Sequence, residues 1–141
     1  MTDTLNIALA QLDYTVGDLA GNRHKVEVAH AEAAEQGADL VVFSELALVG
    51  YPPEDLIFRN EFQQHAMQSV LELAALTKGE APAILVGGIW FEEEEVYNAA
   101  ILLDDGEIHS IVSKYSLPNY GVFDEQRLFA AGSMPEPKIT T

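Results

Sequence analysis

The sequence contains no cysteine among its 141 residues. Without cysteine these residues form no disulfide framework, no thiolate metal site and no thiol nucleophile of their own. Disulfides therefore give no indication of the redox compartment, although a reduced cytoplasm is compatible with their absence.

Basic residues are also scarce, because seven Lys and Arg face 23 Asp and Glu and leave a net charge of −16. Binding to nucleic acids or anionic membranes requires Lys and Arg to neutralise phosphates, so neither is an expected partner. The acidic run Glu92–Glu95 is interpreted as a solvated loop rather than a cation site, because adjacent carboxylates diverge. The overall acidity fits adaptation to salt or simple solubility equally well.

The sequence also lacks long apolar runs and a recognisable targeting signal. No run reaches the roughly 18 residues of a membrane span, and Met1–Thr4 lacks the basic start of a signal peptide. We therefore expect a cytoplasmic protein. The sequence does offer 48% hydrophobic residues with 21% charged ones, a composition typical of a folded domain large enough for a core.

Hydrophobic patterning predicts strands alternating with helices in the order β-α-β-α-β-β-β, an α/β fold. The continuous apolar run Leu40–Phe43 predicts a strand buried on both faces, and Asp104–Gly106 predicts a tight hairpin turn. Expected strands cover about 5–9, 40–43, 83–91, 97–103, 107–112 and the start of one at 138–141; expected helices cover about 22–36, N-capped by Asn22, about 61–77, and a short turn at 124–129.

Two charged residues follow predicted strands directly. Glu45 lies at the carboxyl end of the apolar strand, where open α/β sheets place ligands and where partial shielding from water suits a general base. Lys114 follows the last predicted strand, and its ammonium could stabilise an oxyanion. Each has an alternative role, since Glu45 could cap a backbone or pair with a lysine, and Lys114 could be a surface residue.

Proline-containing loops follow both candidates and carry further candidates for a binding pocket. The residues are Tyr51, Tyr120, Phe123 and Glu125. The alternative for each aromatic residue is a packing role in the core or in a lid. Gly87 and Gly88 inside a predicted strand indicate a close backbone approach or a bulge. The histidines His24, His30, His65 and His109 lack metal-site spacing, so we expect no metal.

Two segments carry a resemblance to a known family. Phe43–Leu56 resembles the glutamate motif of the nitrilase (carbon–nitrogen hydrolase) superfamily, and Lys114–Phe129 resembles its lysine motif. Gly-Tyr-Pro-Pro-Glu-Asp-Leu at 50–56 and Leu-Pro-Asn-Tyr-Gly-Val-Phe-Asp-Glu at 117–125 are closer still to the N-terminal glutaminase domain of bacterial glutamine-dependent NAD synthetases. The resemblance covers essentially all residues and implies part of a four-layer α-β-β-α sandwich.

The resemblance also implies a Glu-Lys-Cys mechanism. Glu45 would be the general base and Lys114 the cation that stabilises the tetrahedral intermediate, while a cysteine attacks the side-chain amide of glutamine. Tyr51, Tyr120, Phe123 and Glu125 would line the glutamine site. Glu125 would order the catalytic groups or hold the amino group of the substrate.

The absent cysteine is a departure from this pattern, because in the family it follows the lysine motif on a later strand. We expect residues 1–141 to be the N-terminal part of the glutaminase domain, without the synthetase domain, and to be inactive alone. No cofactor is expected in this chain, whereas ATP and Mg²⁺ are expected in the synthetase domain of a homo-oligomeric parent, which uses the ammonia to make NAD.

Two other functions stay open. The parent could be a stand-alone nitrilase-type amidase acting on another amide, although the Pro-Pro-Glu-Asp-Leu form favours the first interpretation. The chain could instead be a non-catalytic module that keeps Glu45 and Lys114 as a structural ion pair and uses its acidic surface to bind a partner.

Overall fold

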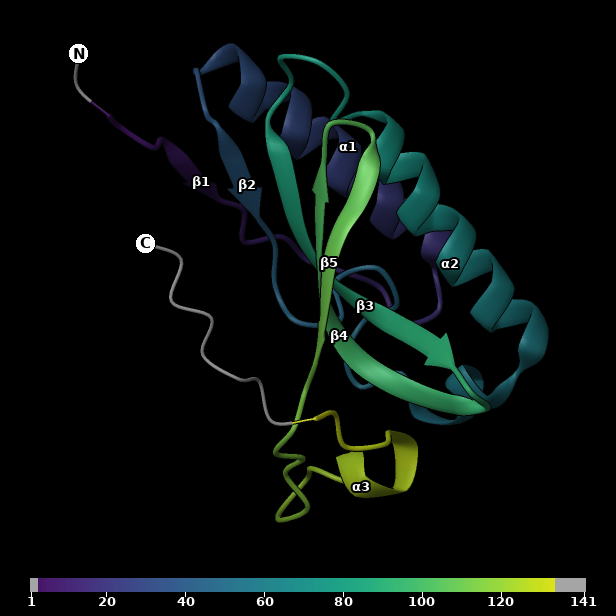
Figure 1. Ribbon diagram of the computed structural model, residues 1–141. Coiled ribbons are helices and arrows are strands. Elements are labelled where there is room, and N and C mark those ends of the chain that lie inside the picture. Colours follow the sequence, from purple (N-terminus) through teal and green to yellow (C-terminus); the bar gives the residue numbers. More distant parts are fainter. Residues whose placement is uncertain (1–2, 134–141) are drawn as a thin grey trace.

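The computed structural model describes residues 3–133 and contains one five-stranded sheet with two long helices against one of its faces (Figure 1). The order of long elements matches the sequence prediction, and the strand expected at 138–141 lies outside the described residues. The elements are β1 (Ile7–Leu9), α1 (Leu19–Glu35), β2 (Leu40–Val42), η1 (Glu54–Phe58), α2 (Asn60–Ala75), β3 (Ala83–Glu92), β4 (Glu95–Asp104), β5 (Glu107–Ser113) and α3 (Glu125–Leu128).

The strands lie in sequence order across the sheet. Strands β1, β2 and β3 are parallel and are connected through α1 and α2, whereas β3, β4 and β5 form an antiparallel meander. Two reversals of direction make β5 run the same way as β2. The segments that follow β2 and β5 therefore leave the sheet at the same end, and both run downward from their strands in Figure 1.

The main core lies between the sheet and the two long helices. Alternate strand residues point to this side, because successive side chains of a strand face opposite ways. Its buried members include Val41, Ile84 and Ile101 from the sheet and Val26 and Leu73 from the helices. Among the residues described, no helix combines the length and apolar character that crossing a membrane requires.

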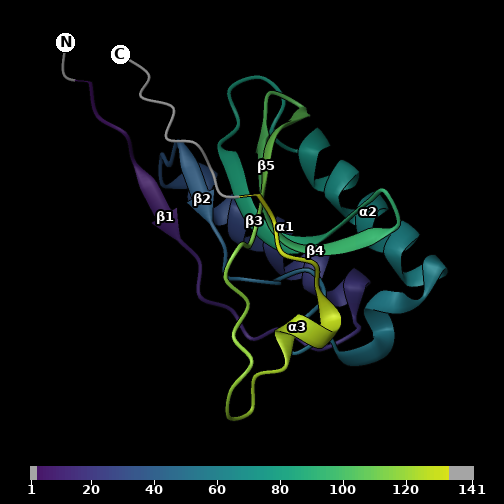
Figure 2. The same cartoon turned by 60° about the horizontal axis from the view of Figure 1, so that its bottom comes forward.

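Within residues 3–133, no helix covers the opposite face of the sheet (Figures 1 and 2). This face carries a row of apolar side chains. Leu9, Val42, Leu85 and Leu102 are register partners across four strands, and Leu9 is 77% exposed. The prediction that residues 40–43 are buried on both faces is therefore wrong for the described structure, because the helices cover one face alone. The α/β class is confirmed, and the helix-on-sheet layering corresponds to a portion of a four-layer sandwich.

Helix α1 begins earlier than the sequence indicates. Asp18 caps it, with its carboxylate accepting a hydrogen bond from the Gly21 backbone at 3.0 Å. Asn22 is fully buried inside the helix instead, and its amide bonds to the Thr15 backbone and to the Leu48 carbonyl. The predicted N-cap thus ties the segment after β1 to the segment after β2, a tertiary role that overrides its local preference.

Both hairpins of the meander turn through left-handed backbone. The predicted turn is confirmed, with φ of 47° at Asp105 and 82° at Gly106. The acidic run is exposed as expected, but it forms an equally tight turn, with φ of 50° at Glu93 and 65° at Glu94. A left-handed residue other than glycine costs about 1–2 kcal/mol, so this acidic hairpin stores strain.

Replacing the strained pair with Glu93→Asn and Glu94→Gly should raise the free energy of unfolding by about 1–2 kcal/mol, because Asn-Gly adopts this turn readily. Urea denaturation measures the change. The double variant also removes two negative charges, so Glu92→Gln with Glu95→Gln is the matched control. Equal gains in both variants would assign the effect to charge and contradict the turn explanation.

Candidate functional site

The turn that follows β2 presents Glu45. The backbone of Phe43 still pairs with Leu85 of β3 at 2.9 Å, and the chain then leaves the sheet through Leu46, whose φ is 52°. Glu45 therefore projects from the carboxyl end of a central strand, as predicted. Its side chain is 47% exposed, so the carboxylate is partly shielded from water, as the sequence indicated.

Gly87 of β3 makes room for this turn. A Cβ at position 87 would lie 2.4 Å from the Leu46 nitrogen and 2.5 Å from the Ser44 oxygen, well inside van der Waals contact. The β3–β4 register passes through Gly87 without a shift. The sequence left a close backbone approach or a bulge as explanations for the glycine pair. The structure supports the close approach, and the backbone that approaches Gly87 is that of Ser44, Glu45 and Leu46.

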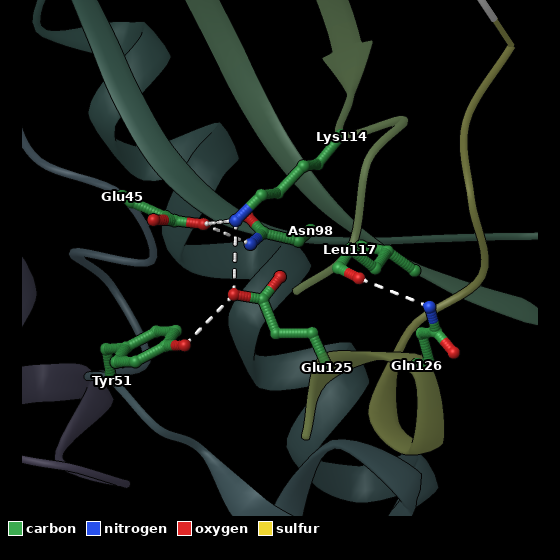
Figure 3. Close-up of polar contacts among 7 residues, drawn as sticks. All are labelled: Glu45, Tyr51, Asn98, Lys114, Leu117, Glu125 and Gln126. Atoms are coloured by element: carbon green, nitrogen blue, oxygen red, sulfur yellow. Dashed lines mark hydrogen bonds and ion pairs between the residues drawn. The ribbon is translucent and has the colours of Figure 1, made fainter. Parts of the chain in front are cut away.

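The backbone of Lys114 is held on both sides. Its N–H donates to the Asn98 carbonyl of β4 at 2.7 Å, and its own carbonyl accepts from the Gly132 N–H at 3.0 Å. Because residue 114 continues the line of β5 along β4, its side chain crosses the sheet edge towards Glu45 (Figure 3).

The ammonium of Lys114 lies between two carboxylates (Figure 3). Its Nζ is 2.7 Å from Glu45 Oε1 and 3.1 Å from Glu125 Oε1. Burial lowers the pKa of Lys114, but hydrogen bonds to both carboxylates outweigh it and leave the pKa above its ordinary value. Lys114 is therefore cationic at neutral pH and can act as a fixed positive charge.

Glu125 links the lysine to the loop after β2. Its carboxylate is 3% exposed, and its Oε1 accepts a hydrogen bond from the Tyr51 hydroxyl at 3.0 Å. Burial, the hydrogen bond to Glu125 and the nearby negative charges raise the pKa of Tyr51 to about 12. The other oxygen, Oε2, is buried and has no hydrogen-bond partner within residues 3–133, which makes it a ready acceptor.

The predicted aromatic residues gather beside this centre. The ring of Phe123 lies 6.4 Å from that of Tyr51 and 5.6 Å from that of Tyr120, both between centroids. Tyr120 is 72% exposed and, together with Lys114, lines a hollow of about 630 Å³. The structure thus brings all six sequence candidates into one region, while their roles in catalysis or binding stay predictions.

A second hollow, of about 340 Å³, opens at the sheet edge and is lined by Glu45, Asn98 and Lys114 with neighbouring strand residues. A larger hollow of about 980 Å³ lies between α2, the acidic hairpin and α3, and its lining contains none of the six candidates. We place the candidate site at the hollow of about 340 Å³, because both Glu45 and Lys114, the charged groups that can act on a substrate, line it.

Asn98 is the site residue that sequence reasoning missed. It is buried in β4, and its Nδ2 donates to Glu45 Oε1 at 2.7 Å, on the same oxygen that contacts Lys114. The signal was an asparagine inside a strand of apolar residues, where its side chain needs a partner. Its amide fixes the orientation of the Glu45 carboxylate.

The histidines contribute no metal centre that the described part of the chain reveals. Within residues 3–133, no group of three or more His, Asp or Glu side chains is placed to hold a metal ion. The ring of His30 is buried on α1 and bonds to the Pro82 carbonyl at 2.9 Å, a packing role.

The sequence and the structure both match known proteins. Residues 6–141 match the family described as carbon-nitrogen hydrolase. A glutamine-dependent NAD(+) synthetase of Thermotoga maritima is 45% identical over 128 residues, which cover 91% of this chain and 22% of the relative. The corresponding protein of Rhodobacter capsulatus is 41% identical, covering 97% of this chain and 25% of the relative. The chain thus spans about a quarter of the length of these curated relatives.

Solved structures agree. Glutamine-dependent NAD+ synthetase from Acinetobacter baumannii, solved with ADP, has a TM-score of 0.85 at 33% identity, covering 91% of this chain and 24% of that one. An amidase from Nesterenkonia sp. has a TM-score of 0.83 at 26% identity, covering 97% of this chain and 51% of that one. A mutant of the Nesterenkonia sp. AN1 amidase carries the acetamide moiety of fluoroacetamide, covalently added at its active site cysteine.

Two adjacent glycines test how Glu45 is placed. Gly87→Ala should lower the free energy of unfolding by about 2–3 kcal/mol, because the new methyl group overlaps the backbone beneath Glu45. Gly88→Ala is the matched control, since its Cβ would make ordinary contacts at 3.6 Å with Ile101 and 3.7 Å with Leu48. Equal losses in urea denaturation would contradict a special role for position 87.

The raised pKa of Tyr51 gives a prediction for alkaline pH. Folding favours the protonated phenol, so its contribution to stability is complete below pH 10 and is lost as the pH rises through about 12. Tyr51→Phe should therefore be less stable than the unmodified chain at neutral pH, by about 1 kcal/mol for the lost hydrogen bond, and should lose less stability above pH 10.

Urea denaturation at several pH values between 7 and 11.5 measures this difference. Tyr120→Phe is the control, because it removes the hydroxyl of a largely exposed tyrosine. Parallel pH profiles for Tyr51→Phe and the unmodified chain would show that Tyr51 does not carry the effect.

Proposed function

Because the chain belongs to the carbon-nitrogen hydrolase family, we propose that it supplies the glutamate and the lysine of a Glu-Lys-Cys glutaminase. The cysteine is supplied by polypeptide outside these 141 residues. The observation that carries the proposal is the Lys114 ammonium, held 2.7 Å from Glu45 beside a hollow that both residues line. A fixed cation next to a carboxylate is the pair that thiol-based amide hydrolysis requires.

Glutamine is the proposed substrate. Support comes from relatives of up to 45% identity that are named glutamine-dependent NAD(+) synthetases, compared with 26% identity to the amidase. We propose that the ammonia feeds ATP-dependent NAD synthesis in the parent enzyme. The similarity to the amidase keeps hydrolysis of another amide as the second candidate, and a substrate comparison separates the two.

In the proposed mechanism Glu45 accepts the proton of the cysteine thiol. The thiolate attacks the amide carbon of glutamine, and Lys114 faces the oxyanion that forms. Glu45 returns the proton to the departing nitrogen, so ammonia leaves and a glutamyl thioester remains. Glu45 then takes a proton from water, the resulting hydroxide attacks the thioester, and the proton passes to the sulfur as glutamate is released.

The buried carboxylate of Glu125 has two proposed tasks. Its Oε1 contacts Lys114 and Tyr51, so it orders both groups. Its Oε2, which has no hydrogen-bond partner within residues 3–133, is proposed to accept a hydrogen bond from the amino group of the substrate. We propose that Tyr51, Tyr120 and Phe123 form an aromatic wall beside this site, against which the aliphatic part of glutamine would lie.

The cofactors of the parent enzyme are proposed to bind outside these 141 residues. We assign no cofactor to these residues and place ATP and Mg²⁺ in the synthetase portion, in line with the ADP bound to the Acinetobacter baumannii enzyme. We further propose a cytoplasmic homo-oligomer. In a four-layer arrangement, a second sheet would pack on the open face that contains Leu9, Val42, Leu85 and Leu102.

The experiment measures ammonia release from glutamine by the parent enzyme. Glu45→Gln and Lys114→Met should each lower kcat/KM by about 10³-fold or more, because each removes a group that acts in the transition state. Glu80→Gln and Lys78→Met are the matched controls, since both residues are exposed and lie outside the site. The isolated 141-residue chain should release no ammonia.

Three outcomes would count against the proposal. Turnover by the isolated chain would show that no external cysteine is needed. Retained activity in Glu45→Gln or Lys114→Met, with a large loss of folding stability, would favour the structural ion pair of a non-catalytic module. Faster hydrolysis of butyramide than of glutamine by the parent would favour the amidase alternative.

A further inference from the structure

Arg127 of α3 joins two distant segments on the outer surface of the site. Its Nη1 is 2.6 Å from Asp55 Oδ1, and its Nη2 is 3.1 Å from Glu54 Oε2, so both contacts reach η1. Its Nε is 2.7 Å from Asp124 Oδ2, just before α3. One guanidinium therefore contacts three carboxylates, two of which lie more than 70 residues away in the sequence.

The same two segments meet a second time on the inner side. Tyr51 lies just before η1 and donates its hydroxyl to Glu125, the first residue of α3. The outer contact is ionic and exposed, whereas the inner contact ends on the buried carboxylate that holds Lys114. Two such contacts, one exposed and one ending on a buried carboxylate, restrain a helix of only four residues.

We propose that Arg127 is a positioning residue of the candidate site. By holding α3 against η1 from outside, it keeps Glu125 between Tyr51 and Lys114. It contacts neither substrate nor reacting atoms and acts through Glu125. The inference rests on the proposed function only in taking the hollow lined by Glu45, Asn98 and Lys114 as the glutamine site.

The geometry suits arginine in particular. A planar guanidinium has donors in several fixed directions and can bind carboxylates on different segments at once, while an ammonium is a single point of charge. Isolated surface ion pairs contribute little, but networks that share one arginine are the exception. The chain has only seven Lys and Arg residues for 23 Asp and Glu. One of these seven, Arg127, contacts three carboxylates at this position.

The test uses the ionisation of Tyr51 in the 141-residue chain, followed by absorbance at 295 nm at pH 11. Subtracting the signal of the matching Tyr51→Phe protein isolates this tyrosine. With a pKa of about 12, about a tenth of Tyr51 is ionised at this pH, whereas an unperturbed tyrosine would be about nine-tenths ionised. Arg127→Gln should move the fraction towards the higher value, and Arg127→Lys should restore part of the shift.

Arg23→Gln is the matched control, because Arg23 also contacts two carboxylates, Glu27 and Glu72, but lies on α1 away from the site. It should leave the ionised fraction unchanged. Far-UV circular dichroism at pH 11 verifies that each variant is folded. An unchanged Tyr51 fraction in folded Arg127→Gln would overturn the proposal.

A second measurement at neutral pH covers the case in which Arg127→Gln unfolds at pH 11. Hydrogen–deuterium exchange should become faster in residues 51–59 and 117–129 of Arg127→Gln, with protection partly restored in Arg127→Lys and α1 unaffected. Unchanged exchange in both segments would also overturn the proposal. Neither experiment contains substrate, so a failed glutaminase assay leaves both results valid.

Discussion

The ammonium of Lys114, placed between the carboxylates of Glu45 and Glu125, is the interaction on which the site depends. Three separate parts of the chain converge on it: the turn after β2, the end of β5 and the start of α3. Two carboxylates this close together would repel each other without a cation between them. The lysine therefore both holds the segments together and keeps a positive charge where an oxyanion would form.

Much of this arrangement could be predicted from the sequence, because position along a strand is a local property. Glu45 and Lys114 each follow an apolar strand, and two parallel strand ends meet at one edge of a sheet. The meeting of Tyr51 with Glu125 could not be derived in the same way. It depends on how two irregular loops fold over the sheet edge, and their local patterns specify only turns.

Three features that local sequence patterns do not specify share one physical cause. Asn22 has the local preference of an N-cap, yet its amide is buried against backbone from two other segments. Asn98 lies in a strand that the sequence predicts, but its role depends on a carboxylate 53 residues away. The strained Glu93–Glu94 turn is fixed by the pairing of β3 with β4 rather than by its own residues. Tertiary contacts override local preference at each of these positions.

The sequence separation of the site contacts has a consequence for the order of folding. Each hairpin of the meander joins strands that are neighbours in the chain, whereas Glu45 and Lys114 are 69 residues apart. Closing so long a loop costs more chain entropy than closing a hairpin. We therefore expect the charged centre to assemble after the two hairpins, so that an intact Lys114 contact reports that the distant segments have also come together.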